Sequence, residues 1–413
     1  MALGRLAGTT ERDARVTLLV VTPWPLGSRG GGPRLAREVA VAMATHHGWR
    51  VHVAAGTGLP GSPAVPVDNT GLVREIRVPL VQHTGARRWW WDRCDNIASA
   101  AHLEGLDPLA DAARPDVIMY ASHYSSAAEQ TAAVAARLRT PFVLLPAIHL
   151  DHRRHVDRSA RRFYRSADLV VCLSRAEREW LVRTARVPAE KVLWLQCGWH
   201  GPAANRSRPR EHSVRLLTVA AFVRHKQVDH QLRALARMRD TLGLRARLTC
   251  AGALADASTL DRLRRLARRL DIEDDVAFRP DVPGADLARL YEDADYFLFT
   301  SRSESLGLVV LDAIASGLVP VVYPHPAYGQ LVKSSGFGAV ANRATPAALA
   351  EAVCLAESGH APPDRGARLN WLRQRTWPLA SAPLAGALRR LSASHPHEGS
   401  RKPARGLTAR RQS

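Results

Sequence analysis

The segment Ser301–Val322, SRSESLGLVVLDAIASGLVPVV, is the most informative part of this chain. It places Glu304 and Asp312 eight positions apart around Gly307, before a helical apolar run and a second strand pattern. Carboxylates accept hydrogen bonds from hydroxyl groups, and the free N–H groups at the positive end of a helix attract phosphate. The segment therefore favours a site for a sugar joined to a diphosphate. An ordinary strand–loop–helix–strand unit with solvated acids would show the same pattern.

Apolar runs that alternate with helical patterns extend on both sides of this segment and predict an α/β protein. Parallel strands covered by helices on both faces have short, continuous apolar runs of this kind. We expect two doubly wound, Rossmann-like domains that face each other across a cleft, with ligands at the carboxyl ends of the strands. The predicted strands are 16–22, 51–55, 116–122, 141–149, 168–174, 191–197, 215–222, 247–253, 276–282, 296–301 and 319–324.

The size and composition of the chain are those of a soluble, two-domain protein. Its 413 residues are enough for two cores of ordinary size, and 46% of them are hydrophobic. No apolar run is long enough to span a membrane, and the start MALGRLAGTTERDARV lacks the apolar core of a secretory signal. The five scattered cysteines have no C-x-x-C spacing, which predicts a reduced, cytoplasmic compartment and no zinc site.

The formal net charge of +20 indicates an anionic partner. A nucleotide-sugar, an anionic membrane surface and nucleic acid all fit this charge, which does not choose among them. A nucleic-acid binder should show aromatic residues interleaved on a basic groove or a known module, and neither is apparent, so no nucleic acid is expected. Nearly all the cations are arginines, so a lysine in a loop is more informative than any one arginine.

The segment around Glu304 resembles the donor-site signature of the retaining GT-B glycosyltransferases of family 4 (glycosyl transferases group 1). Glu304 fits the first acid of that signature, and Asp312 stands where a second Glu is expected. The carboxylate of Asp312 lies one methylene nearer the backbone, so we expect its contact to ribose hydroxyls to be weaker or bridged by water. The resemblance covers about residues 16–391. The small residues that follow in the expected order are Ala313, Ser316, Gly317 and Pro320.

The resemblance also gives the expected domain organisation. A loose extension (1–14) precedes an N-terminal acceptor domain (15–200), and a polar linker (201–213) leads to a C-terminal nucleotide-sugar domain (214–375). A helix over 376–392 is expected to cross back onto the first domain. The polar, basic tail over 393–413 has the composition of a disordered segment.

Two loops are expected to face the donor diphosphate. Gly31 and Gly32 lie in a glycine loop before a helical pattern, where glycines let a backbone approach a ligand and supply N–H donors. The family carries an Arg and a Lys in the loop that here contains Arg224 and Lys226. Lys226 fits the lysine, Ala221 stands at the arginine position, and Arg224 is a candidate substitute. The alternatives are a flexible loop and a solvated basic turn.

The resemblance assigns the remaining site residues. His149, at the end of the predicted strand 141–149, matches a histidine between donor sugar and acceptor, although it could equally be structural. Glu304, Lys226 and His149 form the expected catalytic set. Arg279 and Pro280 lie where the family holds the nucleotide base, largely through backbone groups. Ser305, Leu306, Gly307, Leu308 and Asp312 complete the expected donor site.

These residues predict transfer of a hexose-type sugar from a UDP- or GDP-linked donor to a hydroxyl acceptor, without a metal or cofactor. The acceptor is expected to be a small metabolite or natural product, or a cell-envelope glycan. One alternative is a lipid glycosyltransferase at the inner face of the membrane; another is a GT-B nucleotide-sugar binder with impaired catalysis. Two basic runs are interpreted first as solvated or structural surface, with membrane or acceptor contact as the alternative: Arg87-Arg88-Trp89-Trp90-Trp91, and the arginines Arg153, Arg154, Arg158, Arg161, Arg162 and Arg165.

Two further patterns are interpreted as structural. The glycine motif over 56–61 matches a dinucleotide fingerprint, but the residues after it cannot open the helix that the fingerprint requires. Asp293 and Asp295 have the spacing of a metal-binding pair, but they stand just before a strand pattern.

Overall fold

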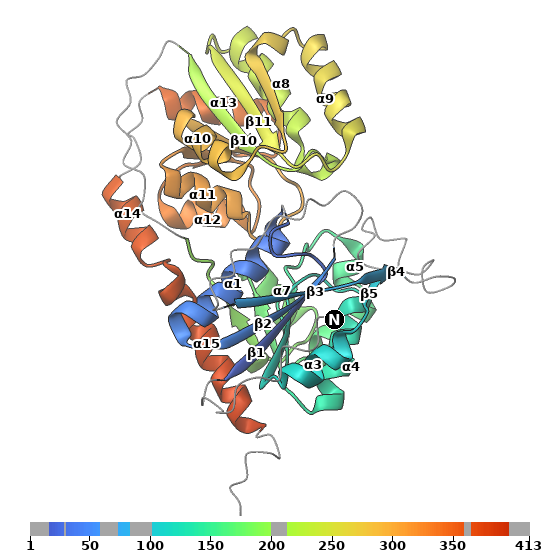
Figure 1. Cartoon of the computed structure of the whole chain (residues 1–413). Coiled ribbons are helices and arrows are strands. Elements are labelled where there is room, and N and C mark those ends of the chain that lie inside the picture. The colour runs from blue at the N-terminus through green and yellow to red at the C-terminus, as the bar shows by residue number, and fades with distance from the viewer. Residues whose placement is uncertain are drawn as a thin grey trace, which may run out of the picture.

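The computed structural model describes residues 16–28, 30–57, 73–82, 101–199, 213–358 and 365–395. These residues form two lobes, each built on one parallel sheet (Figure 1). The predicted N-terminal extension, the Arg87–Trp91 cluster and nearly all of the predicted linker and basic tail lie outside the described residues. The same holds for most of the 56–61 glycine motif.

The first lobe contains a seven-stranded sheet in the order β3-β2-β1-β6-β7-β8-β9, and every strand pair in it is parallel. Helices cover both faces of this sheet. Successive side chains of β1 point to opposite sides, so they are buried in two different clusters. Leu18 and Val20 belong to one buried cluster, whereas Leu19 and Val21 belong to the other. The strands are β1 (Thr17–Thr22), β2 (Arg50–Gly56), β3 (Val73–Val78), β6 (Val117–Tyr120), β7 (Phe142–Leu144), β8 (Leu169–Cys172) and β9 (Val192–Trp194).

Two short strands, β4 (Leu80–Gln82) and β5 (Ala101–Leu103), pair in antiparallel fashion beside the main sheet. The first-lobe helices are α1 (Gly31–His47), α3 (Leu106–Ala113), α4 (Ser126–Leu138), α5 (Arg153–Val156), α6 (Arg158–Ser166) and α7 (Arg175–Arg183). A 3-10 turn over Ala189–Lys191 precedes β9.

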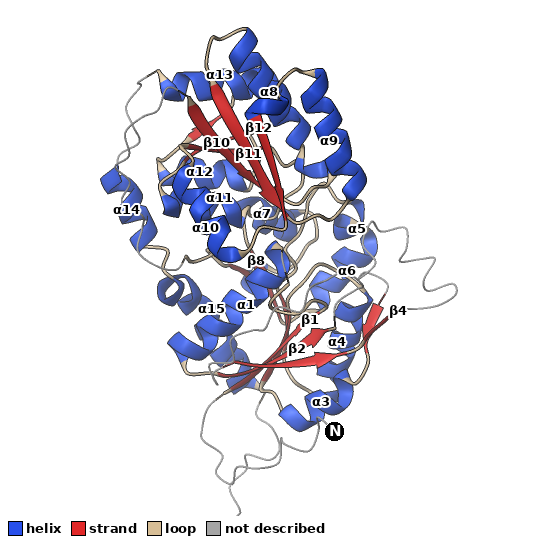
Figure 2. Cartoon of the chain, turned by 45° about the horizontal axis from the view of Figure 1, so that its top comes forward, coloured by secondary structure: helices blue, strands red, loops and turns tan. Residues whose placement is uncertain are grey.

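The second lobe contains a six-stranded parallel sheet in the order β12-β11-β10-β13-β14-β15. Helices lie on both of its faces (Figure 2). Its strands are β10 (Val214–Val219), β11 (Ala246–Gly252), β12 (Val276–Pro280), β13 (Tyr296–Phe299), β14 (Val319–Val322) and β15 (Ala339–Val340). Its helices are α8 (Val228–Asp240), α9 (Ala257–Arg269), α10 (Gly284–Asp293), α11 (Leu308–Ser316), α12 (Tyr328–Ser335) and α13 (Pro346–Glu357), with 3-10 turns over Arg224–Lys226 and Glu273–Asp275.

The end of the chain joins the two lobes. Helix α14 (Arg365–Arg373) contacts α12 of the second lobe, and α15 (Trp377–Ser394) packs on α1 and β6 of the first (Figure 1). The backbone of Trp199 bonds that of Arg375, and the Trp199 indole donates a hydrogen bond to the carbonyl of Leu372. Trp377 is buried beside this crossing.

The strand predicted over 141–149 is wrong in extent, because β7 ends at Leu144. Pro146 has no N–H to donate to a neighbouring strand, and Ala147 has a φ of 45°, which extended backbone does not allow. His149 therefore lies in a loop beyond the strand rather than at its last residue. The strands β3, β4, β5 and β15 were not predicted.

No helix in the described ranges has both the length and the apolar character needed to cross a bilayer.

Candidate active site

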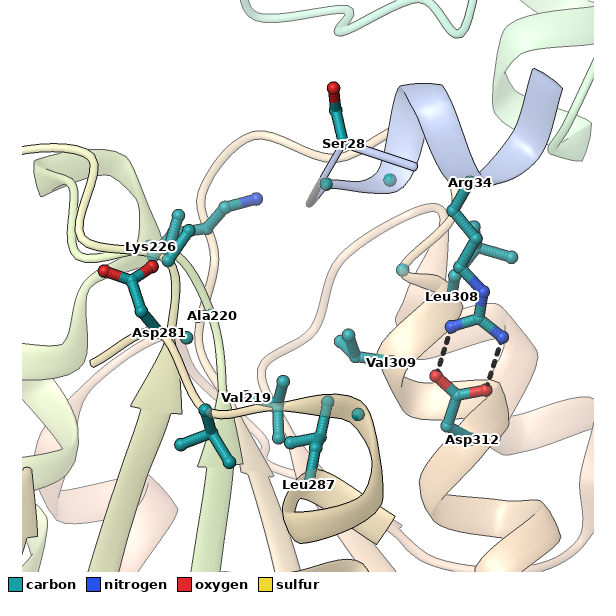
Figure 3. A pocket seen from close by; sticks show the side chains of 18 of the residues that line it. Ser28, Arg34, Val219, Ala220, Lys226, Asp281, Leu287, Leu308, Val309 and Asp312 are labelled. Atoms are coloured by element: carbon teal, nitrogen blue, oxygen red, sulfur yellow. Dashed lines mark hydrogen bonds and ion pairs between the residues drawn. The ribbon is translucent and has the colours of Figure 1, made fainter. Parts of the chain in front are cut away.

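A cavity of about 390 Å³ lies between the two lobes (Figure 3). Its walls come from the carboxyl ends of β1, β10, β11, β12 and β13 with the loops that follow them, and from the N-terminal parts of α1, α10 and α11. The order of the second sheet reverses between β10 and β13, and an open parallel sheet binds its ligands at such a point. The polar lining residues are Ser28, Arg34, Arg37, Lys226, Asp281, Tyr291, Glu304 and Asp312.

Glu304 and Lys226 form an ion pair in this cavity. The Nζ atom of Lys226 lies 2.5 Å from Oε1 of Glu304, and the two side chains are 17% and 12% exposed, respectively. Thr300 holds the lysine loop in place, because its hydroxyl bonds the carbonyl oxygens of Lys226 and Gln227. A carboxylate and an ammonium thus lie beside a space large enough for a ligand.

Gly307 opens α11 at the edge of the cavity. It has a φ of 87°, a conformation that glycine adopts without strain. A Cβ atom at this position would lie 2.9 Å from the Cβ of Tyr328, so the turn also leaves no space for a side chain. The first turn of α11 contains no acidic residue, so its free N–H groups are available to an anion.

Arg34 of α1 reaches across the cavity to Asp312 of α11 (Figure 3). Its two terminal nitrogens lie 2.5 and 2.8 Å from the two carboxylate oxygens, which is the bidentate arrangement of a strong charge-assisted pair. Burial lowers the pKa of Arg34, but the hydrogen bond and charge of Asp312 outweigh it and raise the pKa above its ordinary value. A second contact between the lobes joins the Ser303 hydroxyl to Asp151 at 2.6 Å.

His149 belongs to a cluster of imidazole rings on the first-lobe side. The ring of His155 lies between 4.4 and 5.4 Å, centroid to centroid, from the rings of His123, His149 and His152. Burial is the main cause that lowers the pKa of His149, and the charges of Glu304 and Lys226 act on it in opposite directions. Nδ1 of His155 accepts a hydrogen bond from the backbone N–H of His149, which fixes the loop. Burial therefore favours the neutral form of His123, His149 and His155, and His149 lies within electrostatic range of Glu304 and Lys226.

The structure brings together only part of the predicted site. Six predicted residues line the cavity: Gly31, Lys226, Glu304, Gly307, Leu308 and Asp312. The others are not among its lining residues: Gly32, His149, Arg224, Arg279, Pro280, Ser305 and Leu306. Of these, Arg279 and Pro280 are the last residues of β12, and the next two residues, Asp281 and Val282, line the cavity instead.

Sequence reasoning missed Arg34 and Asp281. Arg34 is one arginine in a chain rich in arginine, and its partner lies 278 positions away, so no local pattern singles it out. Asp281 directly follows the predicted base-binding pair, and its position could have suggested it.

Some residues of the patterns that were interpreted as structural, or left open, make identified hydrogen bonds in the structure. Asp295 accepts hydrogen bonds from the backbone and guanidinium of Arg215, which gives it a structural role. In the basic run, Arg161 and Arg165 donate to the carbonyls of Val156 and Ala185. Among the described residues, no group of three or more His, Cys, Asp or Glu side chains could hold a metal ion.

Comparison with known families matches both halves of the chain. Residues 29–199 match the model "Glycosyltransferase Family 4", and residues 203–365 match "Glycosyl transferases group 1". Over 173 residues the chain is 35% identical to D-inositol 3-phosphate glycosyltransferase of Kineococcus radiotolerans, covering 38% of this chain and 39% of that protein. It is 32% identical over 96 residues to alpha-monoglucosyldiacylglycerol synthase of Streptococcus pneumoniae, covering 23% of this chain and 21% of that protein. These matches thus span well under half of the relatives' own length.

Solved structures match nearly the whole chain. Sucrose-phosphate synthase of Thermosynechococcus elongatus superposes with a TM-score of 0.72 at 17% identity, over 92% of this chain and 100% of that one. Anabaena HepE in complex with UDP and glucose gives 0.68 at 15% identity, over 91% and 100%. At this identity the likeness shows the fold, and the two family models together account for both lobes. The chain therefore belongs to the family 4 glycosyltransferases (glycosyl transferases group 1) and has their GT-B fold.

Proposed function

We propose that this protein transfers a hexose-type sugar from a UDP- or GDP-linked donor to a hydroxyl acceptor, with retention of the anomeric configuration. The observation that carries the proposal is the Lys226–Glu304 pair in the cavity at the switch point of the second sheet. Membership of family 4, in which retention is typical, supports the stereochemistry.

In this proposal the donor is held by groups on both sides of the ion pair. Glu304 accepts hydrogen bonds from sugar hydroxyls, and Lys226 turns to the diphosphate. The N–H groups near Gly307 and Leu308 lie at the positive end of α11 and receive the phosphate oxygens. Asp312 accepts from the ribose hydroxyls, and His149 faces the far side of the sugar.

Bond making and bond breaking then occur on one face of the sugar. The acceptor oxygen bonds to the anomeric carbon as the bond from that carbon to the diphosphate oxygen breaks, and the acceptor's proton passes to the departing diphosphate. No side-chain nucleophile is needed, so catalysis is positioning and stabilisation of the charge that develops on the diphosphate.

We propose a small, polar hydroxyl compound as the acceptor. The imidazole cluster around His149 places polar groups on the first lobe, within electrostatic range of Glu304 and Lys226, and one relative's name includes D-inositol 3-phosphate. The competing candidate is a lipid acceptor at an anionic membrane. It is favoured by the arginines of α5 and α6 and by the relative named alpha-monoglucosyldiacylglycerol synthase.

A thermal-shift panel of UDP-, GDP- and dTDP-sugars tests the donor. Stabilisation by one of them identifies the base, because a ligand that binds only the folded state raises the unfolding temperature. Release of the matching diphosphate with candidate acceptors, small polyols against lipid vesicles, then tests the reaction. Binding without release under any acceptor would favour the impaired-catalysis alternative, and a Lys226→Ala variant with full activity would remove the role of that lysine.

A further inference from the structure

We propose that Arg34 is a second cation for the donor's diphosphate, supplied by the first lobe, and that it reaches the phosphates by leaving Asp312. This inference rests on the proposed function and extends it, because it assigns a binding residue outside the predicted set and a reason for the ion pair between the lobes.

The position of Arg34 suits an anion. It lies in the first turn of α1, which contains no acidic residue. Gly31 of that turn and Gly30, which precedes the helix, also line the cavity. The positive end of α1 and the guanidinium therefore face the same space from the first lobe (Figure 3). The positive end of α11 faces that space from the second lobe.

The charges of the cavity point to the same residue. Among the described lining residues, the three cations Arg34, Arg37 and Lys226 balance the three acids Asp281, Glu304 and Asp312. A diphosphate brings negative charge with no cation of its own, so a paired cation must change partner. Both arginines lie near Glu38 of the same helix, but only Arg34 also directs its two terminal nitrogens to Asp312 of the other lobe. The side chain of Arg37 is 45% exposed and that of Arg34 is 34% exposed.

The second lobe provides little competition for this role. Ala221 lines the cavity with only a methyl group, and Arg224 is not among the lining residues. A guanidinium bonds a phosphate through the same planar fork that it uses for a carboxylate. In the structure the carboxylate of Asp312 thus occupies the fork that a phosphate would take, and keeps Arg34 oriented across the cleft.

The exchange has a consequence for the other end of the donor. Both oxygens of Asp312 are occupied by Arg34 in the structure. When Arg34 moves to the diphosphate, these oxygens become free to accept hydrogen bonds from ribose hydroxyls. Phosphate recognition and ribose recognition are therefore coupled through one ion pair.

The test measures how much the diphosphate adds to binding. Dissociation constants of the nucleoside diphosphate that stabilises the protein, and of its nucleoside, are measured by calorimetry at one ionic strength. We expect Arg34→Ala to lower the ratio of the two affinities about 10- to 100-fold, and Arg34→Lys to give an intermediate loss, because it keeps the charge and loses the fork. Arg137→Ala is the matched control: it removes an arginine paired with Asp107 and Asp111 on the first lobe, away from the cavity.

Asp312→Asn separates this role from that of a structural latch. It breaks the same ion pair but frees Arg34, so the contribution of the diphosphate to binding, measured as the ratio of the two affinities, should be kept or increased. If Arg34→Ala and Asp312→Asn reduced this ratio equally, or if Arg34→Ala left it unchanged in a folded protein, the inference would be overturned. If the wild-type protein bound no nucleoside diphosphate, the proposed function itself would fail. If Lys226→Ala lost binding of the nucleoside diphosphate while Arg34→Ala kept the wild-type ratio of the two affinities, this inference would be refuted and the proposed function would stand.

Discussion

At the scale of single residues, the site contains two ion pairs between charged side chains. Glu304 holds Lys226 within the second lobe, and Asp312 holds Arg34 across the cleft. Each pair combines a group suited to hydroxyls with a group suited to phosphate. Donor binding in our account replaces both pairs by contacts to one ligand.

The first prediction concerns Glu304. We expect Glu304→Ala to lower the turnover number a hundredfold or more, since loss of one pre-organised contact to the transition state costs about 3–4 kcal/mol. Steady-state release of the diphosphate measures this effect. Glu351→Ala is the control, because it removes a glutamate of α13 that pairs with Arg237 of α8. Near-normal turnover in Glu304→Ala would contradict the donor-site assignment.

Single residues of the site were also the features that the sequence predicted least completely. Glu304, Asp312 and Lys226 follow a local pattern, so they could be predicted from it, and the structure places them around one cavity. Arg34 could not be predicted, because its importance depends on two lobes that come together only in the folded protein. His149 matched a pattern, but Pro146 and Ala147 end the strand early and move it into a loop.

At the scale of elements, the start of α11 depends on one glycine. We expect Gly307→Ala to reduce the free energy of unfolding by about 1–3 kcal/mol, because the new Cβ is strained at a positive φ and meets Tyr328. It should also weaken donor binding, since the first turn of α11 must shift. Denaturant unfolding and calorimetry measure the two effects.

Gly336→Ala is the control for that substitution. Gly336 also has a positive φ, 61°, but a Cβ there meets nothing within 4 Å. This variant should show the backbone strain without the clash and without the loss of donor affinity. Equal effects of the two variants on donor binding would contradict a special role for the Gly307 turn.

The imidazole cluster predicts sensitivity to acid. Burial lowers the pKa of His123 to about 4, and the pKa of His155 and of His149 is also lowered. Between the ordinary value of about 6.5 and pH 4, the unfolded chain therefore binds protons that the folded chain does not. The free energy of unfolding should fall as the pH is lowered through this range.

His123→Phe tests the cause of this sensitivity. It keeps a ring beside His155 but removes one titrating group, so the plot of unfolding free energy against pH should become less steep between about pH 6.5 and 4. The slope is the readout, because loss of the contact to Ser122 also changes the absolute stability. A slope equal to that of the wild type would show that His123 does not contribute.

The elements themselves were largely predictable. Strands such as β1, β2 and β10 are mostly apolar and are buried along most of their length, because both faces of their sheets are covered. The missed strand β3 (VREIRV) lies at the edge of the sheet and is buried only at its two end residues, and β15 spans only two residues. Neither leaves an apolar run that a sequence pattern could identify.

At the scale of the whole molecule, α15 fastens the end of the chain to the first lobe. Leu384 of this helix is fully buried, whereas Leu379 is 59% exposed. We expect Leu384→Ala to reduce the free energy of unfolding by about 2–5 kcal/mol and Leu379→Ala to change it by about 0.5 kcal/mol or less. Chemical denaturation of the two variants makes the comparison, and equal effects would contradict the packing of α15 described above.

Two facing sheets could be predicted from the sequence, but the way the lobes meet could not. The alternation of strands and helices repeats in each half of the chain, which indicates two domains. The contacts between the lobes join residues that are 152 and 278 positions apart, Asp151 with Ser303 and Arg34 with Asp312. Such pairs have no local signal, so the alternation predicted a cleft between two domains but not the residues that meet across it.

In our proposal an activated sugar binds between the lobes, and the decisive measurement is a crystal structure with the nucleotide-sugar that stabilises the protein. We predict density for the diphosphate at the first turn of α11 beside Lys226, with the sugar against Glu304. Density for the same compound at any other place on the molecule, with the cavity empty, would contradict the account.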